Sequence, residues 1–203
     1  IAFRLSGAYS TDCTIASTTM ALDLKTRSWS SEMLKAAGID ASIFPPASEG
    51  GTKIGEVTRE AAEQTGLPLG AAVVTGGHDC EIATLGAGVV AEEVFVDITG
   101  TWEIILANLN HFAPSKEAFA AGLDHECHAF AGYYNCQGLM IAGGAVEWVR
   151  NQFYRDTAEP TQAYATMLEE AKAEPLGAEG VMVLPAFVRG IGPAQAHDPL
   201  GTV

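Results

Sequence analysis

The chain has 203 residues, of which 48% are hydrophobic and 18% charged, a composition typical of a folded protein and not of a disordered one. It carries 11 Lys and Arg residues against 25 Asp and Glu, and its formal charge of -14 argues against nucleic acid or an anionic membrane as a partner. Because no apolar run is long enough to span a bilayer and the first residues do not resemble a signal peptide, we expect a cytoplasmic protein.

The cysteines and the two ends of the sequence carry further information. Cys13, Cys80, Cys127 and Cys136 are widely spaced and form no CxxC pair, so we expect free thiols. The sequence does not begin with Met, and it stops shortly after a turn signal. We therefore expect it to be a piece of a longer chain.

The first part of the chain alternates short strands and helices. A β-branched stretch predicts a strand that runs into a turn, and the two helices that follow each have a Ser or Thr near the start and a Gly at the end. The expected elements are a strand within 14–24, a helix within 30–38, a Pro/Gly-rich loop at 43–51, a helix within 58–66 and a strand within 67–77.

The second part contains a hairpin among further helices and strands. Apolar spacings predict a helix after Asp79, and two strands within 93–107 are joined at Gly100 and Thr101. The remaining expected elements are a strand within 127–138, a helix from about Gly144, a helix within 160–177 and a strand at 181–187. The fold class is therefore α/β with mixed sheets, and a composition change near residues 90–97 predicts two sub-domains.

Asp79 is the strongest candidate for chemistry. It follows an apolar strand and two glycines, at the end of a strand where open α/β sheets bind ligands. There it could accept a proton from a substrate hydroxyl that attacks phosphorus. The alternative is that Asp79 only caps the following helix, and His78 is expected to form a structural hydrogen bond.

Two further motifs could bind phosphate or nucleotide. The Gly100–Thr101 turn could offer N–H groups and a hydroxyl to a phosphate, although a plain hairpin would explain it too. The small residues at 143–145 precede a helix that carries Glu147, and they would let a nucleotide lie against the backbone or two helices pack closely. The sequence contains no Walker A loop and no GxGxxG after a strand.

In this order, the motifs resemble those of the FGGY carbohydrate kinases. The matching blocks are TDCTIASTTM at 11–20 with Trp29, IGEV at 54–57 with TGLPLG at 65–70, GGHD at 76–79 with GAG at 86–88, Gly100–Thr101, and GGAVEW at 143–148. The resemblance covers nearly the whole chain and implies part of a ribonuclease H-like, actin-hexokinase-type ATPase fold. It further implies that residues 1–92 end a sugar-binding domain and that 93–203 begin an ATP-binding domain.

The resemblance also implies an activity and roles for particular residues. The protein would be a carbohydrate kinase that uses ATP and Mg²⁺ to phosphorylate a sugar, such as a ketose, or a polyol. Asp79 would be the general base, with Cys80 and His78 beside it at the substrate. Gly100, Thr101, Gly143 and Glu147 would bind the nucleotide, and no residue is assigned to a resident metal site.

The sequence also departs from the family pattern. Ile15 stands where Asn is usual and Cys80 where Gln, Asn or His is common, and both bear on sugar preference; Trp102 follows the GT pair in place of a small residue. The opening D-x-G-T phosphate loop and the later Gly-rich adenine loop are missing, so we expect these residues alone to be inactive. A sheet cut at its first strand would expose an edge, which favours a homodimer.

Two other interpretations remain open. The protein could be a non-catalytic sugar- or nucleotide-binding module that keeps the kinase fold. Residues 124–128 (DHECH), with Cys136 or His111, could bind zinc, although consecutive residues on a strand point to opposite faces.

Overall fold

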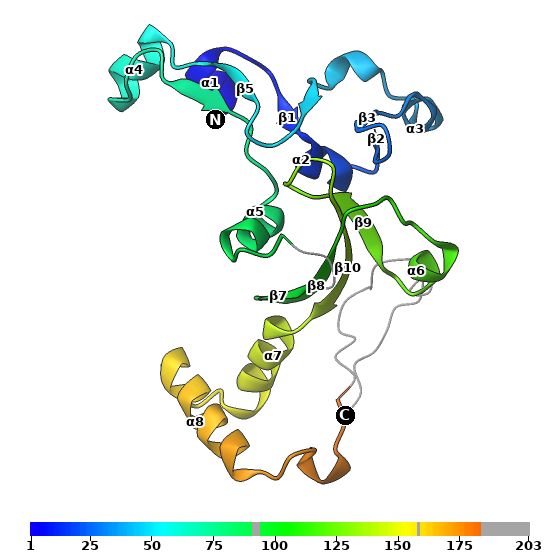
Figure 1. Cartoon of the computed structure of the whole chain (residues 1–203). Helices are drawn as coiled ribbons and strands as arrows, with labels where there is room; N and C mark the ends of the chain where they lie inside the picture. The colour runs from blue at the N-terminus through cyan, green and yellow to red at the C-terminus, as the bar shows by residue number, and fades with distance from the viewer. Residues whose placement is uncertain (91–93, 158, 184–203) are drawn as a thin grey trace. The chain divides into compact units, whose positions relative to one another are not determined.

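The computed structural model describes residues 1–90, 94–157 and 159–183, and the chain divides into two compact units (Figure 1). The first unit consists of Ile1–Val96, Leu106–Pro114 and His125–Cys136, and the second of Asp97–Ile105, Ser115–Asp124 and Gln137–Val203. The expected domain boundary between residues 92 and 93 lies outside the described ranges and stays a prediction.

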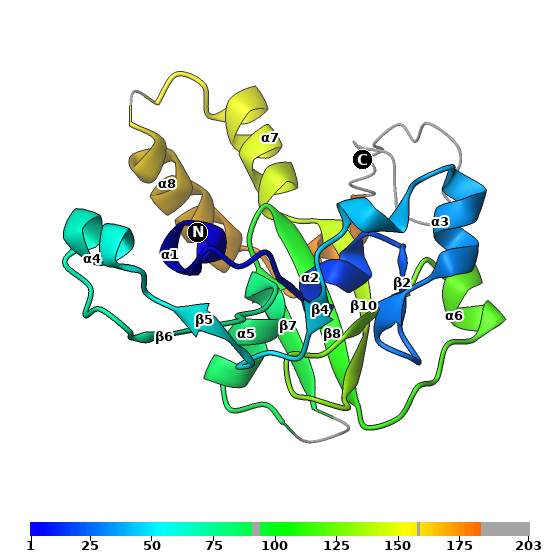
Figure 2. The same cartoon turned by 90° about the horizontal axis from the view of Figure 1, so that it is seen from above.

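The first unit begins with a helix beside a two-stranded sheet. Helix α1 (Ala2–Ser6) lies along strands β5 (Lys53–Glu56) and β6 (Ala72–Val74), as Figures 1 and 2 both show. Strands β5 and β6 are antiparallel, and helix α4 (Arg59–Thr65) connects them. Val57, Ala61 and Val73 form the small core of this part, so that β6 is held firmly just before the Gly76–Gly77 turn.

The strand expected within residues 14–24 is confirmed only at β2 (Leu22–Asp23), because the chain forms helix α2 (Cys13–Thr18) before it. Strand β1 (Thr11–Asp12), which pairs in parallel with β4 (Ala47–Ser48), leads directly into this helix. The Asp12 carboxylate accepts hydrogen bonds from the N–H groups of Thr14 and Ile15, each at 3.0 Å. This N-cap starts a helix despite the β-branched residues that suggested a strand.

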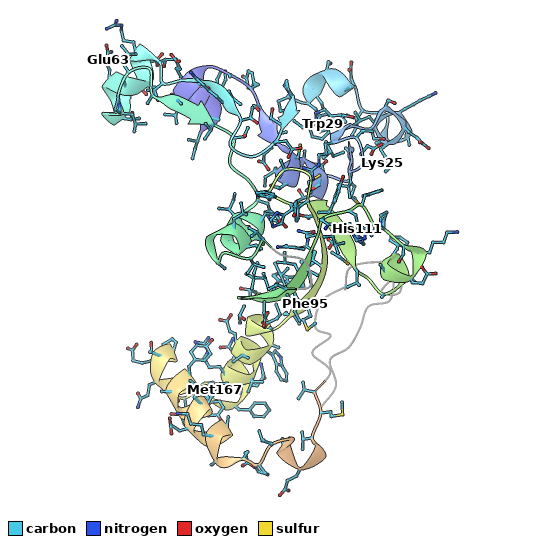
Figure 3. The ribbon with its side chains drawn as sticks, in the orientation of Figure 1. Lys25, Trp29, Glu63, Phe95, His111 and Met167 are labelled. Atoms are coloured by element: carbon cyan, nitrogen blue, oxygen red, sulfur yellow. The ribbon has the colours of Figure 1, made fainter. Side chains whose placement is uncertain are left out.

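After α2 the chain forms a short antiparallel pair, β2 (Leu22–Asp23) and β3 (Ser28–Trp29), and then helix α3 (Ser31–Ala37) and the short helix η1 (Ala41–Ile43). The centroid of the Trp29 ring, a residue labelled in Figure 3, lies 4.4 Å from the centroid of the Phe44 ring. The predicted caps are confirmed. Ser30 caps α3 and Thr58 caps α4, and each helix ends at a glycine with positive φ, Gly38 at 69° and Gly66 at 76°.

A four-stranded sheet follows helix α5 (Asp79–Gly86). Its strands are β7 (Phe95–Thr99), β8 (Trp102–Leu109), β9 (Asp124–Cys127) and β10 (Tyr134–Ile141), in the order β7-β8-β10-β9. Helix α6 (Lys116–Ala120) lies between β8 and β9 in the sequence. The hairpin at Gly100 and Thr101 is confirmed, but the single strand expected within 127–138 is instead the end of β9, a turn and the start of β10.

Helices α7 (Gly143–Phe153) and α8 (Pro160–Ala173), followed by η2 (Ala178–Gly180), belong to the second unit. Both helices begin where the sequence predicted, within one residue. In α8, Leu168 is 62% exposed and Ala163 is the buried residue. Of the strand expected at 181–187, residues 181–183 form none and the others lie outside the described residues.

Two sequence expectations concern the chain as a whole. None of the helices in the described ranges is both long and apolar enough to cross a bilayer. The four cysteines are free thiols, as expected.

Candidate active site

The Gly76–Gly77 turn carries the chain from β6 to α5 and places Asp79 in the first turn of that helix. A Cβ atom on Gly77 would lie 2.9 Å from Ile82 Cδ1 and 3.3 Å from Thr14 Oγ1. A larger residue at position 77 would therefore have to displace the Ile82 side chain, so glycine favours the close approach of α2 and α5.

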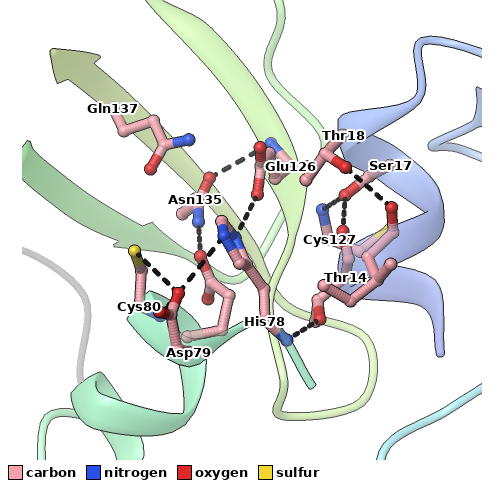
Figure 4. Close-up of polar contacts among 12 residues, drawn as sticks. Thr14, Ser17, Thr18, His78, Asp79, Cys80, Glu126, Cys127, Asn135 and Gln137 are labelled. Carbon is pink, nitrogen blue, oxygen red and sulfur yellow. Dashed lines mark hydrogen bonds and ion pairs between the residues drawn. The ribbon is translucent and has the colours of Figure 1, made fainter.

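The Asp79 carboxylate is held by one of its two oxygens. Oδ1 accepts a hydrogen bond from the Cys80 N–H at 2.9 Å and one from the Cys80 thiol at 3.5 Å, and His78 Nε2 lies 3.3 Å from it (Figure 4). The side chain is 92% exposed, and none of these contacts uses Oδ2. The Cys80 hydrogen bonds and the nearby His78 lower the pKa of Asp79, so the ionised carboxylate is the favoured form.

The capping interpretation of Asp79 is correct only in part. The N-cap position of α5 belongs to His78, and Asp79 is the first helical residue. Its carboxylate does accept one N–H of the first helical turn, that of Cys80. A helix cap needs no more than this single oxygen, so the capping role leaves Oδ2 available for chemistry.

His78 is fixed at both its backbone and its ring. Its N–H donates to Thr14 Oγ1 at 2.6 Å, and the Thr14 hydroxyl in turn donates to the buried Asp12 carboxylate. The ring nitrogen Nδ1 lies 3.4 Å from Glu126 Oε2, and the Glu126 side chain is only 8% exposed. His78 therefore links the Asp79 carboxylate to α2 on one side and to β9 on the other (Figure 4).

Glu81 extends this polar cluster into the protein interior. It is fully buried, accepts a hydrogen bond from Asn135 Nδ2, and has Oε2 at 3.6 Å from His128 Nε2. Burial, reinforced by the negative charge of Glu126, raises the pKa of Glu81 to about 8. Burial also lowers the pKa of His128, whose Nδ1 accepts the Phe130 N–H at 2.9 Å.

Cys80 lies beside the carboxylate as a protonated thiol. Burial, followed in size by the hydrogen bond to Asp79, raises the pKa of Cys80 to about 11. A thiol with such a pKa is a poor nucleophile at neutral pH.

The expected nucleotide residues come together in the second unit. The Gly143 N–H donates to Gly100 O at 3.0 Å, and the Gly144 N–H donates to Thr101 O at 3.2 Å. A Cβ atom on Gly143 would lie 2.3 Å from Gly100 O, so only glycine allows this contact.

The hydrogen-bonding groups that the Gly100–Thr101 turn could offer to a phosphate differ from those expected. The Gly100 N–H already donates to Trp102 O at 2.9 Å, whereas none of these bonds uses the Thr101 N–H or hydroxyl. Glu147 is 58% exposed and lies 3.4 Å from Arg150 Nη2.

The predicted site residues thus form two groups, each within one unit. His78, Asp79 and Cys80 belong to the first unit, and Gly100, Thr101, Gly143 and Glu147 to the second. Sequence reasoning assigned no role to Glu81 or Asn135 and no separate role to Thr14, and it considered Glu126 only as a possible zinc ligand, whereas the fold joins these four residues into the polar cluster around His78. The Thr-Asp start of α2 was a usable signal for Thr14, whereas nothing in the sequence distinguishes Glu81 from a surface glutamate.

The stretch at 124–128 does not gather its side chains around one point. Glu126 lies at His78, His128 lies at Glu81, and Asp124 Oδ2 accepts a hydrogen bond from Gln137 Nε2 at 3.5 Å. Within the described ranges, the three-residue group whose ligand atoms all lie within 4.8 Å of one another is instead His78, Asp79 and Cys80.

Comparison with known proteins agrees with these features. Residues 1–86 match the N-terminal domain of the FGGY family of carbohydrate kinases. The chain is 38% identical over 178 residues to L-fuculokinase of Escherichia coli K12, covering 88% of this chain and 37% of that protein. It is 32% identical over 188 residues to autoinducer-2 kinase of Enterobacter sp. strain 638, covering 90% of this chain and 35% of that protein.

Among solved structures, xylulose kinase from Rhodospirillum rubrum matches with a TM-score of 0.81 and 26% identity, over 98% of this chain and 39% of that one. The chain therefore has part of the expected mixed α/β fold of the actin-hexokinase type, and it spans little more than a third of the length of these relatives. These likenesses support the chain being a fragment of a carbohydrate kinase of the FGGY family.

Proposed function

We propose that this chain belongs to an enzyme that transfers a phosphoryl group from ATP to a hydroxyl of a sugar, with Asp79 as the general base. Asp79 accepts the proton of the attacking hydroxyl, which raises the nucleophilicity of that oxygen as it approaches phosphorus. The transferred proton leaves a neutral carboxylic acid at Asp79, which loses it to solvent after the product departs.

A single observation carries the proposal, namely the way in which the Asp79 carboxylate is held. Two hydrogen bonds from Cys80 hold Oδ1, His78 Nε2 lies 3.3 Å from it, and the side chain is 92% exposed. The carboxylate is thus oriented by the protein while Oδ2 stays accessible to a substrate. Fixing a reacting group in advance is a main source of catalytic rate.

The second unit would supply the nucleotide site. Gly143 and Gly144 let the start of α7 pack on the Gly100–Thr101 turn, and none of the backbone bonds between them uses the Thr101 hydroxyl, which could contact a phosphate. Glu147 lies one turn further along α7, at the expected edge of the ATP site. Mg²⁺ bound with ATP would stabilise the charge on the phosphates during transfer, and no residue of this chain is assigned to it.

The substrate is expected to be a ketose. The names of two relatives, L-fuculokinase and xylulose kinase, favour L-fuculose and xylulose as the first compounds to test. Polyols such as glycerol form the second group, because Cys80 and Ile15 differ from the residues that are common at these positions in the family. A cytoplasmic location and a homodimer remain expectations for the whole protein.

The proposal is tested by Asp79→Asn in the full-length protein. We expect kcat to fall by roughly 10²- to 10⁴-fold with little change in sugar affinity, because the amide cannot accept the proton. The matched control is Asp156→Asn, which changes an exposed aspartate in the second unit and should leave kcat unchanged. Calorimetry measures sugar binding, and a coupled assay measures ADP release.

Normal turnover by the Asp79→Asn variant would overturn the assignment of the base. If neither the wild-type protein nor the variant phosphorylated any sugar or polyol while both still bound sugar or ATP, the protein would be a binding module that keeps the kinase fold.

A further inference from the structure

His78, Asp79 and Cys80 bring three different kinds of metal-binding atom together at the start of α5. The imidazole Nε2, the carboxylate Oδ1 and the thiol Sγ all lie within 4.8 Å of one another. Nε2 is 3.3 Å from Oδ1, and Sγ is 3.5 Å from Oδ1. Nitrogen, oxygen and sulfur ligands of these types are those that Zn²⁺ accepts in proteins.

The two measured separations agree with a tetrahedral metal site. With Zn–N and Zn–O bonds of about 2.1 Å and a Zn–S bond of about 2.3 Å, tetrahedral ligands lie about 3.4 Å apart for N and O and about 3.6 Å apart for O and S. Both values are within about 0.1 Å of the separations between these side chains. The remaining pair, Nε2 and Sγ, has to close to a similar distance, which side-chain rotation of His78 and Cys80 can provide.

The surroundings of His78 support the same assignment. A histidine that binds a metal through one nitrogen commonly donates its other N–H to a carboxylate, which fixes the ring and its tautomer. Here Nδ1 lies 3.4 Å from Glu126 Oε2. The Glu126 N–H in turn donates to Asn135 Oδ1 at 3.1 Å, so the carboxylate is anchored on β9. With Nδ1 beside Glu126, Nε2 is the ring nitrogen that lies near Asp79 and Cys80.

Local charge and access are also compatible with a cation. Asp79 and the thiolate of Cys80 would neutralise a divalent ion, and Glu126 adds a third negative charge behind His78. The positive end of the α5 dipole would repel the metal ion. The same dipole stabilises the anionic ligands Asp79 and Cys80, which offsets that repulsion. Because Asp79 is 92% exposed, the ion can enter from solvent and keep a water molecule as its fourth ligand.

We propose that His78, Asp79 and Cys80 form a binding site for one thiophilic divalent cation, Zn²⁺ in the first instance. Binding forms an S–metal bond and releases the Cys80 thiol proton to solvent, with no change of oxidation state. The bound ion occupies the Asp79 carboxylate and therefore competes with the sugar hydroxyl. The binding itself is independent of the proposed function, whereas the inhibition rests on it.

The binding test uses the full-length protein and absorbance. Cd²⁺ gives a thiolate-to-metal absorption band on titration, and Zn²⁺ affinity is measured by competition with a chromophoric chelator. We expect one ion per chain, loss of the band in Cys80→Ser, and an affinity about 10- to 100-fold lower in Glu126→Gln. Cys136→Ser, which changes a different partly buried cysteine, should bind as the wild-type protein does.

A measurement on the wild-type protein keeps the proposal testable if a variant fails to fold. Zn²⁺ should protect Cys80, but not Cys136, from alkylation detected by mass spectrometry. Equal alkylation of Cys80 with and without Zn²⁺, or an unchanged Cd²⁺ band in folded Cys80→Ser, would overturn the site and leave a simple hydrogen-bonded cluster.

Activity measurements separate this proposal from the previous one. Zn²⁺ should inhibit phosphorylation in competition with the sugar, and a zinc-selective chelator should restore the rate. If Asp79→Asn were fully active while Zn²⁺ still protected Cys80, the metal site would stand and the assignment of the base would fail.

Discussion

Glu81 is a fully buried carboxyl two residues after the proposed base, and it makes stability depend on pH. The folded protein keeps this proton up to about pH 8, whereas an unfolded glutamate loses it near 4.5. Between these values the unfolded state binds fewer protons, so the free energy of unfolding decreases as pH rises. The slope is at most about 1.4 kcal/mol per pH unit.

His128 has the opposite effect at lower pH. Its pKa is lowered from 6.5, so its contribution to the free energy of unfolding increases with pH and levels off near that value. The effect of Glu81 is therefore clearest between pH 6.5 and about 8.

We predict that urea unfolding of the wild-type protein shows stability falling across this window, and that Glu81→Gln flattens the dependence because the amide does not titrate. Glu63→Gln, at an exposed position on α4, is the control and should keep the wild-type slope (Figure 3). Equal slopes for Glu81→Gln and wild type would contradict the assignment.

Helix α2 connects its own N-cap to the site through the Thr14 hydroxyl. This group, in a side chain that is 2% exposed, accepts from the His78 N–H and donates to Asp12. We predict that Thr14→Val lowers the free energy of unfolding by about 1–3 kcal/mol, because both partners lose a buried hydrogen bond. The rate of phosphorylation should also fall, since His78 would no longer be held.

Thr18→Val is the matched control for this prediction. Thr18 lies on the same helix, is exposed, and bonds only the Ile15 carbonyl, so the change should be within about 0.5 kcal/mol. Denaturant unfolding gives the free energies. Similar decreases in the free energy of unfolding for both variants would mean that the hydrogen bond from His78 to α2 adds no more stability than an exposed side-chain hydrogen bond.

Backbone hydrogen bonds join the start of α7 to the β7–β8 turn. Gly143→Ala would place a Cβ atom 2.3 Å from Gly100 O, whereas Gly144→Ala would meet mainly the flexible Ile141 side chain at 3.0 Å. We predict that Gly143→Ala lowers stability by about 1–3 kcal/mol and weakens ATP binding, and that Gly144→Ala does so less. Thermal unfolding and nucleotide titration check both effects, and equal effects of the two variants would contradict this account.

At the scale of the whole molecule, the proposed phosphorylation would require residues of both units. The proposed base lies in the first unit and the proposed nucleotide residues in the second. The sequence contains no D-x-G-T loop of the kind that binds phosphate in this family. Charge on the transferred phosphoryl group is stabilised only by groups that are already positioned around it.

We therefore predict that a protein of these 203 residues alone shows no measurable turnover, while the full-length protein is active. A coupled assay of ADP release compares the two at equal concentration. The Asp79→Asn full-length variant provides the baseline. Turnover of the isolated chain near the full-length rate would show that the missing phosphate loop is dispensable.

Local patterns in the sequence were sufficient for the features that depend on neighbouring residues. Helices α3 and α4 were predicted with their Ser and Thr caps and their glycine ends, because capping and positive φ are decided within a few residues. The Gly100–Thr101 hairpin and the position of Asp79 after two glycines were read in the same way. The order of these motifs along the chain also indicated the family.

The fold decided the features that depend on contacts between distant residues. Residues 14–18 have strand-forming side chains, but the Asp12 cap and burial against Cys127 make them a helix. Glu81 and Asn135 look like ordinary polar residues in the sequence, and Glu126 was considered there only as a possible zinc ligand. The three meet because α5 packs on β9 and β10. Desolvation and the charge of a neighbour set the pKa of Glu81, and neither quantity exists until the chain has folded.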